Sequence, residues 1–422
     1  MTERLPWRRL AALVAVLALM AGACSDEKTD SPAAGSDDSV AEDAAQPATG
    51  EPIVFGNLSV LTGTIALPQG GEAVQAYFDD WNARGGYEGR PLQLLVEDSQ
   101  LDPAVGVAAA SKLIEQDGVL GMVGNTFLFD CAVNGEAYRQ QSVPSIVLGI
   151  DQSCFENEII FPVSPGPTNM FEMPIQYLLD EGRSSIYFAG LSIPATELQI
   201  ADIESYLAAN GDGAELVGSS SLPFGPAGGP TAADIDGFLA DVASSGADAV
   251  AVSIDQDSLA TALERAEANG IGTDDVTWIA ASGVYNPSYI DLFGQPGEGL
   301  NIFDSFDPFQ SEDEGTQEVA AIFEENDITP DAFAAAGWVA ASVLEQAMAE
   351  VQGELTRESL AAALASLDSV QAPLVLDPFD FTDPAQPSAD DPRVNSASGK
   401  VVAIEDGEFV LVTEDWIVPV GS

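Results

Sequence analysis

Short apolar segments alternate with amphipathic segments along most of the chain after Glu51, and this rhythm constrains the fold more than any other feature. Between the first two apolar segments, Val74, Tyr77, Phe78 and Trp81 recur at helical spacing. The first four strand-like segments are PIVFGNLSVL (52–61), PLQLLVED (91–98), VLGMVG (119–124) and VPSIVLG (143–149). They are short and apolar, as the buried strands of parallel sheets are.

The rhythm then resumes with a second set of alternating segments. Its strand-like members are 184–192, 215–222, 247–254 and 276–282, and helix-like stretches at 196–209, 231–244 and 257–269 separate them. Strands that alternate with helices imply right-handed crossovers and parallel sheets, so two sets predict two α/β lobes. Ligands bind such sheets beyond the carboxyl ends of the strands, and we therefore look for site residues in the loops that follow strands.

The charge balance excludes several classes of partner. Among 422 residues there are 68 acidic and 13 basic side chains, a net charge of −55. Nucleic-acid binding needs a basic surface, and docking on anionic lipid through charge needs one too. The acidic residues are scattered through the chain, which is typical of a surface that stays soluble, and we expect an adaptation to salty surroundings in which screening weakens self-repulsion.

The chain has no histidine, which excludes Ser-His-Asp and Cys-His catalysis, histidine metal sites and histidine pH switches. Enzymes built on carboxylates or lysine remain possible by composition, but nothing in the sequence fixes the separation of a catalytic pair. We therefore predict that the protein is not an enzyme, and we predict no metal and no cofactor. The acidic segment 376–392 lacks the spacing of a calcium loop and is interpreted as a solvated loop.

The N-terminal region has the pattern of an export signal. A basic start with Arg4, Arg8 and Arg9 precedes the apolar run 10–20, and three small residues then lead to Cys24. Small residues that end at a cysteine resemble the bacterial lipoprotein box, although Ala21 stands where a leucine is usual. We predict a signal peptide over 1–23 and a lipid-anchored flexible linker over 24–50, with lipidation at Cys24 and an extracytoplasmic, membrane-anchored location. The alternative is an ordinary signal peptide followed by an incidental cysteine.

The folded part contains a specific string between Asn82 and Pro103. It reads N-x-x-G-G-x-x-G-R, then a strand, then ED-x-x-x-D-P. With LSVLTG, VPSIV and the segment GADAVAVSIDQDSLATALERAEANGI, this order resembles the type I extracytoplasmic solute-binding proteins. The most similar branch comprises the Leu/Ile/Val-binding receptors of ABC importers.

The resemblance implies two Rossmann-like lobes with parallel sheets, joined by a three-crossover hinge that closes around a small molecule. Lobe I is expected at 51–165 plus 308–367, and lobe II at 166–307 plus 368–422. The implied partners are a small solute and the ABC permease subunits.

The pocket positions depart from the amino-acid-binding pattern of that family. GNTFLFD (124–130) replaces the usual serines after the third strand, Asp151 stands at a threonine position, and Asp255 replaces a tyrosine. The acidic residue that receives the substrate ammonium aligns with Ser282. The α-amino-acid signature is therefore missing from both lobes.

The remaining strand-end residues are the candidate ligand contacts. They are Thr62, Asn125, Thr126, Phe127, Asp151, Gln152, Asp255, Ser282 and Tyr285. Such groups suit a small polar or amide-like ligand, and Asp151 with Asp255 would favour a cation. Each residue also has a purely structural interpretation, as a solvated loop residue or a helix cap, and for Phe127 as core packing.

Cys131 and Cys154 are the remaining cysteines, and in an exported protein such a pair predicts a disulfide. The alternative is two buried free thiols. The leading prediction for function is an extracytoplasmic solute-binding lipoprotein that captures a small polar solute, such as an amino acid or an amide, and delivers it to an ABC importer. The alternative is a ligand-sensing module of the same fold that serves a signalling partner.

Overall fold

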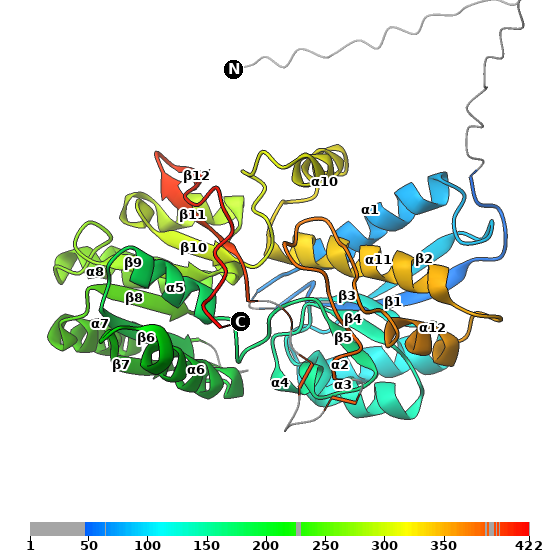
Figure 1. Ribbon diagram of the computed structural model, residues 1–422, viewed down its shortest axis with the longest axis horizontal. Helices are drawn as coiled ribbons and strands as arrows, with labels where there is room; N and C mark the ends of the chain where they lie inside the picture. The colour runs from blue at the N-terminus through cyan, green and yellow to red at the C-terminus, as the bar shows by residue number, and fades with distance from the viewer. Residues whose placement is uncertain are drawn as a thin grey trace, which may run out of the picture. The chain divides into compact units, whose positions relative to one another are not determined.

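The computed structural model describes residues 47–421, apart from Thr64, 225–228, Ala385, 388–391, Val394 and Ser396. The predicted signal peptide, Cys24 and most of the predicted linker lie outside these residues. The described part contains two sheets, each flanked by helices on both faces (Figure 1).

The first sheet has five parallel strands in the order β2-β1-β3-β4-β5. Their bounds are β1 Ile53–Ser59, β2 Leu92–Asp98, β3 Met122–Asn125, β4 Ser145–Val147 and β5 Ile160–Pro162. The four strand-like segments predicted in this part of the chain form β1 to β4. The sheet and its helices are lobe I.

Two apolar clusters cover the two faces of this sheet. One contains Phe55, Val74 and Trp338, and the other contains Leu58, Leu113 and Phe155. The helices of lobe I are α1 Gln69–Ala83, α2 Pro103–Ser111, η1 Lys112–Gln116, α3 Asp130–Gln140, α4 Gln152–Phe155, α10 Glu314–Glu325, α11 Ala332–Glu350 and α12 Arg357–Leu364. Among the described residues α11 is the one helix long and apolar enough to cross a membrane, but 78% of that stretch is buried, as in a core helix.

The second sheet has seven strands in the order β12-β11-β10-β9-β8-β6-β7 and belongs to lobe II. The strands are β6 Ser185–Leu191, β7 Glu215–Leu222, β8 Ala249–Ser253, β9 Thr277–Ala281, β10 Asn301–Asp304, β11 Lys400–Glu405 and β12 Glu408–Leu411. Strands β6 to β9 are parallel as predicted and β10 extends the parallel sheet, whereas β11 and β12 form an antiparallel edge; the sequence did not predict β10, β11 or β12. The helices of lobe II are α5 Glu172–Asp180, α6 Pro194–Asn210, α7 Ala232–Ser245, α8 Gln256–Ala268 and α9 Ile290–Phe293, with short 3₁₀ turns at Ser282–Val284, Pro287–Tyr289 and Gln295–Gly297.

The chain passes between the lobes three times. It crosses after β5, after β10, and again before β11. Asp307 in the second crossing and Lys400 just after the third form a buried ion pair with a 2.6 Å N–O distance. Asn395 in the third crossing donates hydrogen bonds from Nδ2 to the carbonyl oxygens of Pro162, at 2.9 Å, and Ser164, at 3.0 Å, in the first. The three crossings are therefore bonded to one another.

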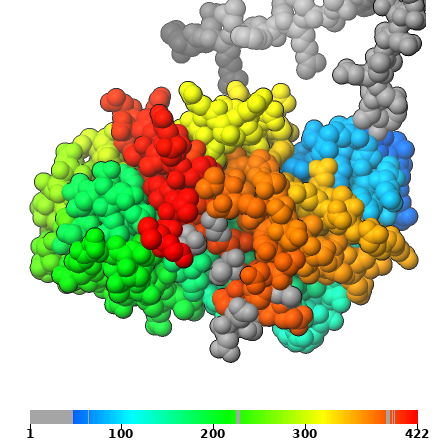
Figure 2. Space-filling view, viewed as in Figure 1, coloured from blue at the N-terminus to red at the C-terminus, as the bar shows by residue number. Residues whose placement is uncertain are grey.

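The third crossing begins later than the predicted boundary at 368. Val370, Leu374, Phe379 and Phe381 belong to an apolar cluster of lobe I. Figure 2 shows this part of the chain, in orange, against the rest of that lobe. These side chains pack on lobe I because the segment passes over its apolar face before it reaches β11.

Candidate functional site

A cavity of about 490 Å³ lies between the lobes, and its walls come from both of them. Lobe I contributes Leu128 and Phe129 after β3, Leu148, Ile150 and Asp151 after β4, and Phe333 at the start of α11. Lobe II contributes residues after β6, β8 and β9, at 191–195, 253–256 and 281–283. The cavity therefore lies at the carboxyl ends of the strands, where the α/β pattern predicts a ligand.

Most of the lining is apolar. Aliphatic side chains and two methionines, Met170 and Met173, surround the cavity, together with six aromatic residues. The aromatic residues are Phe129, Phe224, Tyr289, Phe303, Phe306 and Phe333. Such a lining buries apolar ligand surface, so it does not support the small polar solute predicted from the candidate residues.

Three of the predicted ligand residues line the cavity: Asp151, Asp255 and Ser282. Asp151 caps α4, since Oδ1 accepts hydrogen bonds from the amide of Ser153, at 2.9 Å, and from its hydroxyl. Asp255 caps α8 and accepts from the amide of Ser258, at 3.0 Å, and from its hydroxyl, at 2.6 Å. Both aspartates are thus helix caps that also face the cavity. The structural interpretation as a cap and the position of a ligand contact therefore apply to the same two residues.

Three other predicted residues, Asn125, Thr126 and Phe127, lie outside the large cavity, beside a void of about 20 Å³ in lobe I. Asn125 accepts from the amide of Leu58 at 3.0 Å and donates to Asp130 at 2.6 Å, both within the core. Thr126 donates to the carbonyl oxygen of Leu67 at 2.7 Å, and Phe127 packs in an apolar cluster. These side chains fix the loop after β3 and do not face the cavity.

Thr62, Gln152 and Tyr285 also lie outside the cavity lining. The Thr62 hydroxyl donates to Asp98 at 2.5 Å and ties the loop after β1 to β2. Tyr285 is buried, donates to Gln310 at 2.7 Å and accepts from the amide of Phe309 at 3.0 Å. Tyr285 therefore supports the second crossing between the lobes.

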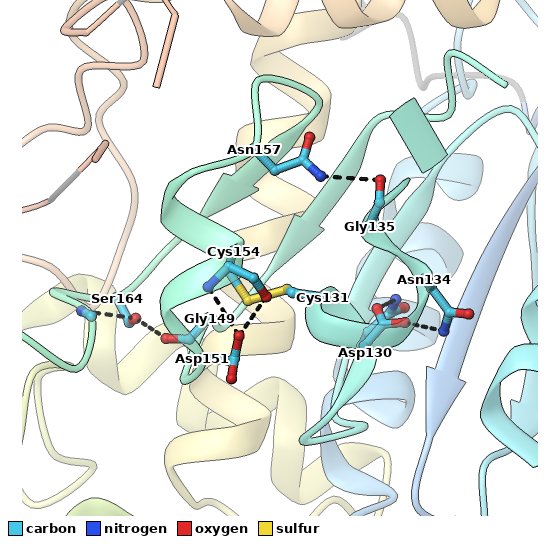
Figure 3. Close-up of a disulfide and its surroundings, with 12 residues drawn as sticks. Asp130, Cys131, Asn134, Gly135, Gly149, Asp151, Cys154, Asn157 and Ser164 are labelled. Carbon is cyan, nitrogen blue, oxygen red and sulfur yellow. Dashed lines mark hydrogen bonds between the residues drawn. A yellow bond between two sulfur atoms is a disulfide. The ribbon is translucent and has the colours of Figure 1, made fainter. Parts of the chain in front are cut away.

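The predicted disulfide between Cys131 and Cys154 is confirmed, with an S–S distance of 2.04 Å. It joins α3 to α4, directly beside the turn that presents Asp151 (Figure 3). Asn157 adds a hydrogen bond of 3.0 Å from Nδ2 to the carbonyl oxygen of Gly135 in α3. Covalent and hydrogen bonds thus hold the short α4 in place against lobe I.

Sequence reasoning missed Gln199 of α6, which is 4% exposed and lines the cavity. Its Nε2 contacts the sulfur of Met170 at 3.7 Å, and its buried Oε1 has no hydrogen-bond partner among the described residues. The signal was present in the sequence, because Gln199 shares a helical face with the buried Ile203 and Tyr206. A polar side chain on a buried helical face is the pattern that would have identified it.

Buried carboxyl groups stand close to this site. Asp304 ends β10, and burial raises its pKa to about 8, with repulsion from Asp331 adding to the shift. Burial likewise raises the pKa of Asp331 to about 7, against hydrogen bonds from the amide of Ala334 and from Asn286 that lower it. Within the described part of the chain, no lysine or arginine lines the cavity.

The described residues contain no group of three histidine, cysteine or acidic side chains placed to hold a metal ion. The cavity has an apolar wall that carries a few hydrogen-bond acceptors, among them Asp151 and Asp255.

Comparison with known proteins gives a family match over most of the chain. A family model described as "Periplasmic binding protein" matches residues 52–391. Comparison with curated protein sequences gives no significant match.

Solved structures share the fold at low sequence identity. A possible leucine/isoleucine/valine-binding protein from Rhodopirellula baltica is 18% identical over 88% of this chain and 98% of its own, with a TM-score of 0.71. An ABC transporter solute-binding protein from R. palustris, in complex with benzoate, is 19% identical over 88% and 97%, with a TM-score of 0.69. A fatty acid ABC transporter substrate-binding protein from Thermomonospora curvata is 18% identical over 90% and 98%, with a TM-score of 0.70.

Proposed function

Because the chain belongs to the periplasmic binding protein family, we propose that it captures a small, largely apolar solute between its lobes and delivers it to an ABC permease. The family consists of extracytoplasmic solute-binding proteins that are not enzymes. Its proteins work through a difference in affinity between the open and closed arrangements of the lobes.

The apolar interlobe cavity is the observation that carries this proposal. Its volume of about 490 Å³ lies within the range of sites that bury most of a small ligand. Each Å² of apolar surface that such a wall removes from water contributes about 25 cal/mol. A free amino acid carries two charges on a small body, and this wall leaves most of its polar groups without partners.

The similar structures support the transport role and the chemistry of the solute. Proteins of this fold include one solved with benzoate and one described as serving fatty acids. Both ligands have an apolar body, like the one that this cavity suits. The family fold therefore accommodates the class of solute that we propose.

We further propose that the protein is held at the membrane through a lipid on Cys24, with 25–50 as the tether. The sequence pattern before Cys24 supports this part of the proposal. Mass spectrometry of the N-terminal peptide from membranes would show an acylated Cys24, and Cys24→Ala would release the protein from the membrane fraction. An unmodified Cys24 on a protein that stays soluble after export would contradict the anchor.

The solute class is tested by thermal-shift measurement on the purified chain with two panels of compounds. Aromatic and aliphatic solutes are expected to raise the melting temperature, since a ligand at about 100 times its Kd stabilises the folded state by roughly 2.7 kcal/mol. Free amino acids are expected to have little effect. Ser282→Trp, which occupies part of the cavity, should weaken the response without unfolding the protein. A response to polar amino acids alone would overturn the proposal.

A further inference from the structure

Two carboxylates face the cavity from opposite lobes. Asp151 belongs to lobe I and Asp255 to lobe II, and both side chains are half-buried. No lysine or arginine lines the cavity in the described part of the chain to balance them. Lys400 lies at the crossing, but its ammonium is bonded to Asp307 at 2.6 Å.

Capping alone does not account for the negative charge at these positions. A helix cap needs an oxygen acceptor, which asparagine supplies as well as aspartate does. Asp151 uses Oδ1 for its two hydrogen bonds to Ser153, so Oδ2 is left for other contacts. Each carboxylate oxygen of Asp255 receives one bond from Ser258 and can accept another.

Gln199 is an independent observation at the same cavity. Its side chain is nearly fully buried, and its Oε1 lacks a hydrogen-bond partner in the described structure. A buried amide oxygen without a donor is costly, and a ligand group that donates a hydrogen bond removes that cost. Oε1 itself is shielded from the open cavity, so a ligand donor reaches it when the Gln199 side chain turns toward the cavity. In that arrangement Gln199 favours a ligand that carries a donor.

From these observations we infer that the solute is an apolar organic ammonium: an aromatic or aliphatic body in the cavity with an amine head held by Asp151, Asp255 and Gln199. This inference deepens the proposed function and rests on it. The ammonium donates to the carboxylates and the amide, and the aromatic wall adds cation–π attraction. A carboxylate head of the same size meets two like charges and no cation, which disfavours it.

The buried Asp304 near the cavity adds little negative charge at neutral pH, because a pKa of about 8 leaves this carboxyl group largely protonated. The raised pKa values of Asp304 and Asp331 arise mainly from burial, and repulsion between the two groups raises that of Asp304 further. The negative charge that faces a ligand is therefore that of Asp151 and Asp255.

The test uses three matched probes, phenylbutylamine, phenylbutanol and phenylbutanoate, whose bodies are the same and whose heads differ in charge. Calorimetric titration of the full chain at neutral pH is expected to rank them amine first, alcohol second and carboxylate last. We expect the amine to bind about tenfold more tightly than the alcohol, the scale of a charged hydrogen bond. Its affinity should fall as salt increases.

Variants separate charge from packing. Asp151→Asn with Asp255→Asn keeps both caps but removes both charges, and should weaken the amine about tenfold while leaving the alcohol unchanged. Gln199→Leu should weaken the amine and the alcohol together, since both heads donate. Asp257→Asn is the matched control, because Asp257 is an exposed residue of the same α8 that does not line the cavity.

The outcomes distinguish this inference from the proposed function. Phenylbutanoate binding as tightly as phenylbutylamine, or an unchanged amine affinity in the folded double variant, would overturn the ammonium inference and leave an apolar-solute receptor standing. Failure of every apolar compound, including the wider thermal-shift panels, would overturn both.

Discussion

Asp304 ends β10 almost completely out of contact with water, in a chain whose many other acidic residues are mostly solvated. Burial raises its pKa from the ordinary 3.8 to about 8. Its Oδ1 accepts from the amide of Phe306 at 3.1 Å, so the group shapes the turn that leads into the second crossing. Asp304 thus shapes the turn from β10 into the second crossing and keeps its proton at neutral pH.

We predict that Asp304→Asn flattens the pH dependence of stability. Between about pH 4 and pH 8 the folded Asp304 keeps a proton that the unfolded chain has lost, so the free energy of unfolding falls as pH rises through that range. The slope from this one group is at most on the order of 1 kcal/mol per pH unit. Urea unfolding at several pH values measures it.

The exposed Asp257→Asn serves as the control for the loss of one charge. It should leave the slope nearly unchanged. An Asp304→Asn protein with the wild-type slope between about pH 5 and pH 8 would show that this group is ionised in the folded state.

At the level of single residues, the sequence located the site but did not resolve which side chains face it. Asp151 and Asp255 follow strands and Asn125 ends one, yet the first two line the cavity and Asn125 is bonded into the core. Strand order decides at which edge a residue lies. The direction in which a side chain points depends on partners that are distant in sequence, such as Leu58 for Asn125. One sequence alone does not show these partners.

Among the elements, α1 and α11 approach each other through a pair of glycines. A Cβ on Gly337 would lie 2.2 Å from the carbonyl oxygen of Gly70, so the two helices pack at a distance that only glycine permits here. The long α11 forms much of the lobe I core, and its position depends on this contact.

We predict that Gly337→Ala destabilises the protein by about 2 kcal/mol, the cost of forcing a methyl group into a packed interface. Gly237→Ala in α7 is the matched control, because a Cβ there meets nothing within 4 Å. It should stabilise by roughly 0.5–1 kcal/mol through helix propensity. Chemical denaturation compares the two, and equal effects of the two changes would contradict the close approach.

The disulfide between α3 and α4 carries another prediction at this scale. Its cysteines are 23 residues apart, and a cross-link that closes such a loop stabilises by about 3 kcal/mol. We predict that Cys131→Ser with Cys154→Ser loses this amount in urea unfolding. Reductant should then destabilise the wild type but not the variant, and an unaffected wild type would contradict the prediction.

The alternation of the segments predicted the main strands because buried parallel strands are short and apolar. It did not predict β5, of three residues, β10, of four residues, or the antiparallel pair β11 and β12. These strands are recognised by the neighbour to which they pair, and local alternation along the sequence does not show that neighbour. The neighbour of β11 is β10, almost a hundred residues earlier in the chain.

The whole molecule has a net charge of −55. Folding brings these like charges close together, and their mutual repulsion destabilises the folded state. We predict that its melting temperature rises as potassium chloride increases from about 0.1 M to about 1 M, over which the screening length falls from about 10 Å to about 3 Å. Glu264→Gln with Glu267→Gln, two exposed changes on α8, should reduce the increase. Stability that is independent of salt would contradict an adaptation to saline surroundings.

The buried pair of Asp307 and Lys400 ties two crossings together without lining the cavity, although the neighbouring Phe306 and Ser398 do line it. In a two-lobed receptor the observed affinity is the intrinsic affinity scaled by the fraction of molecules in the closed form. We therefore expect the lining to decide which molecule binds, and the bonds between the crossings to decide how long it stays bound. Residence time can then change through substitution of Asp307 or Lys400, which do not line the cavity, while the surface that recognises the solute remains the same.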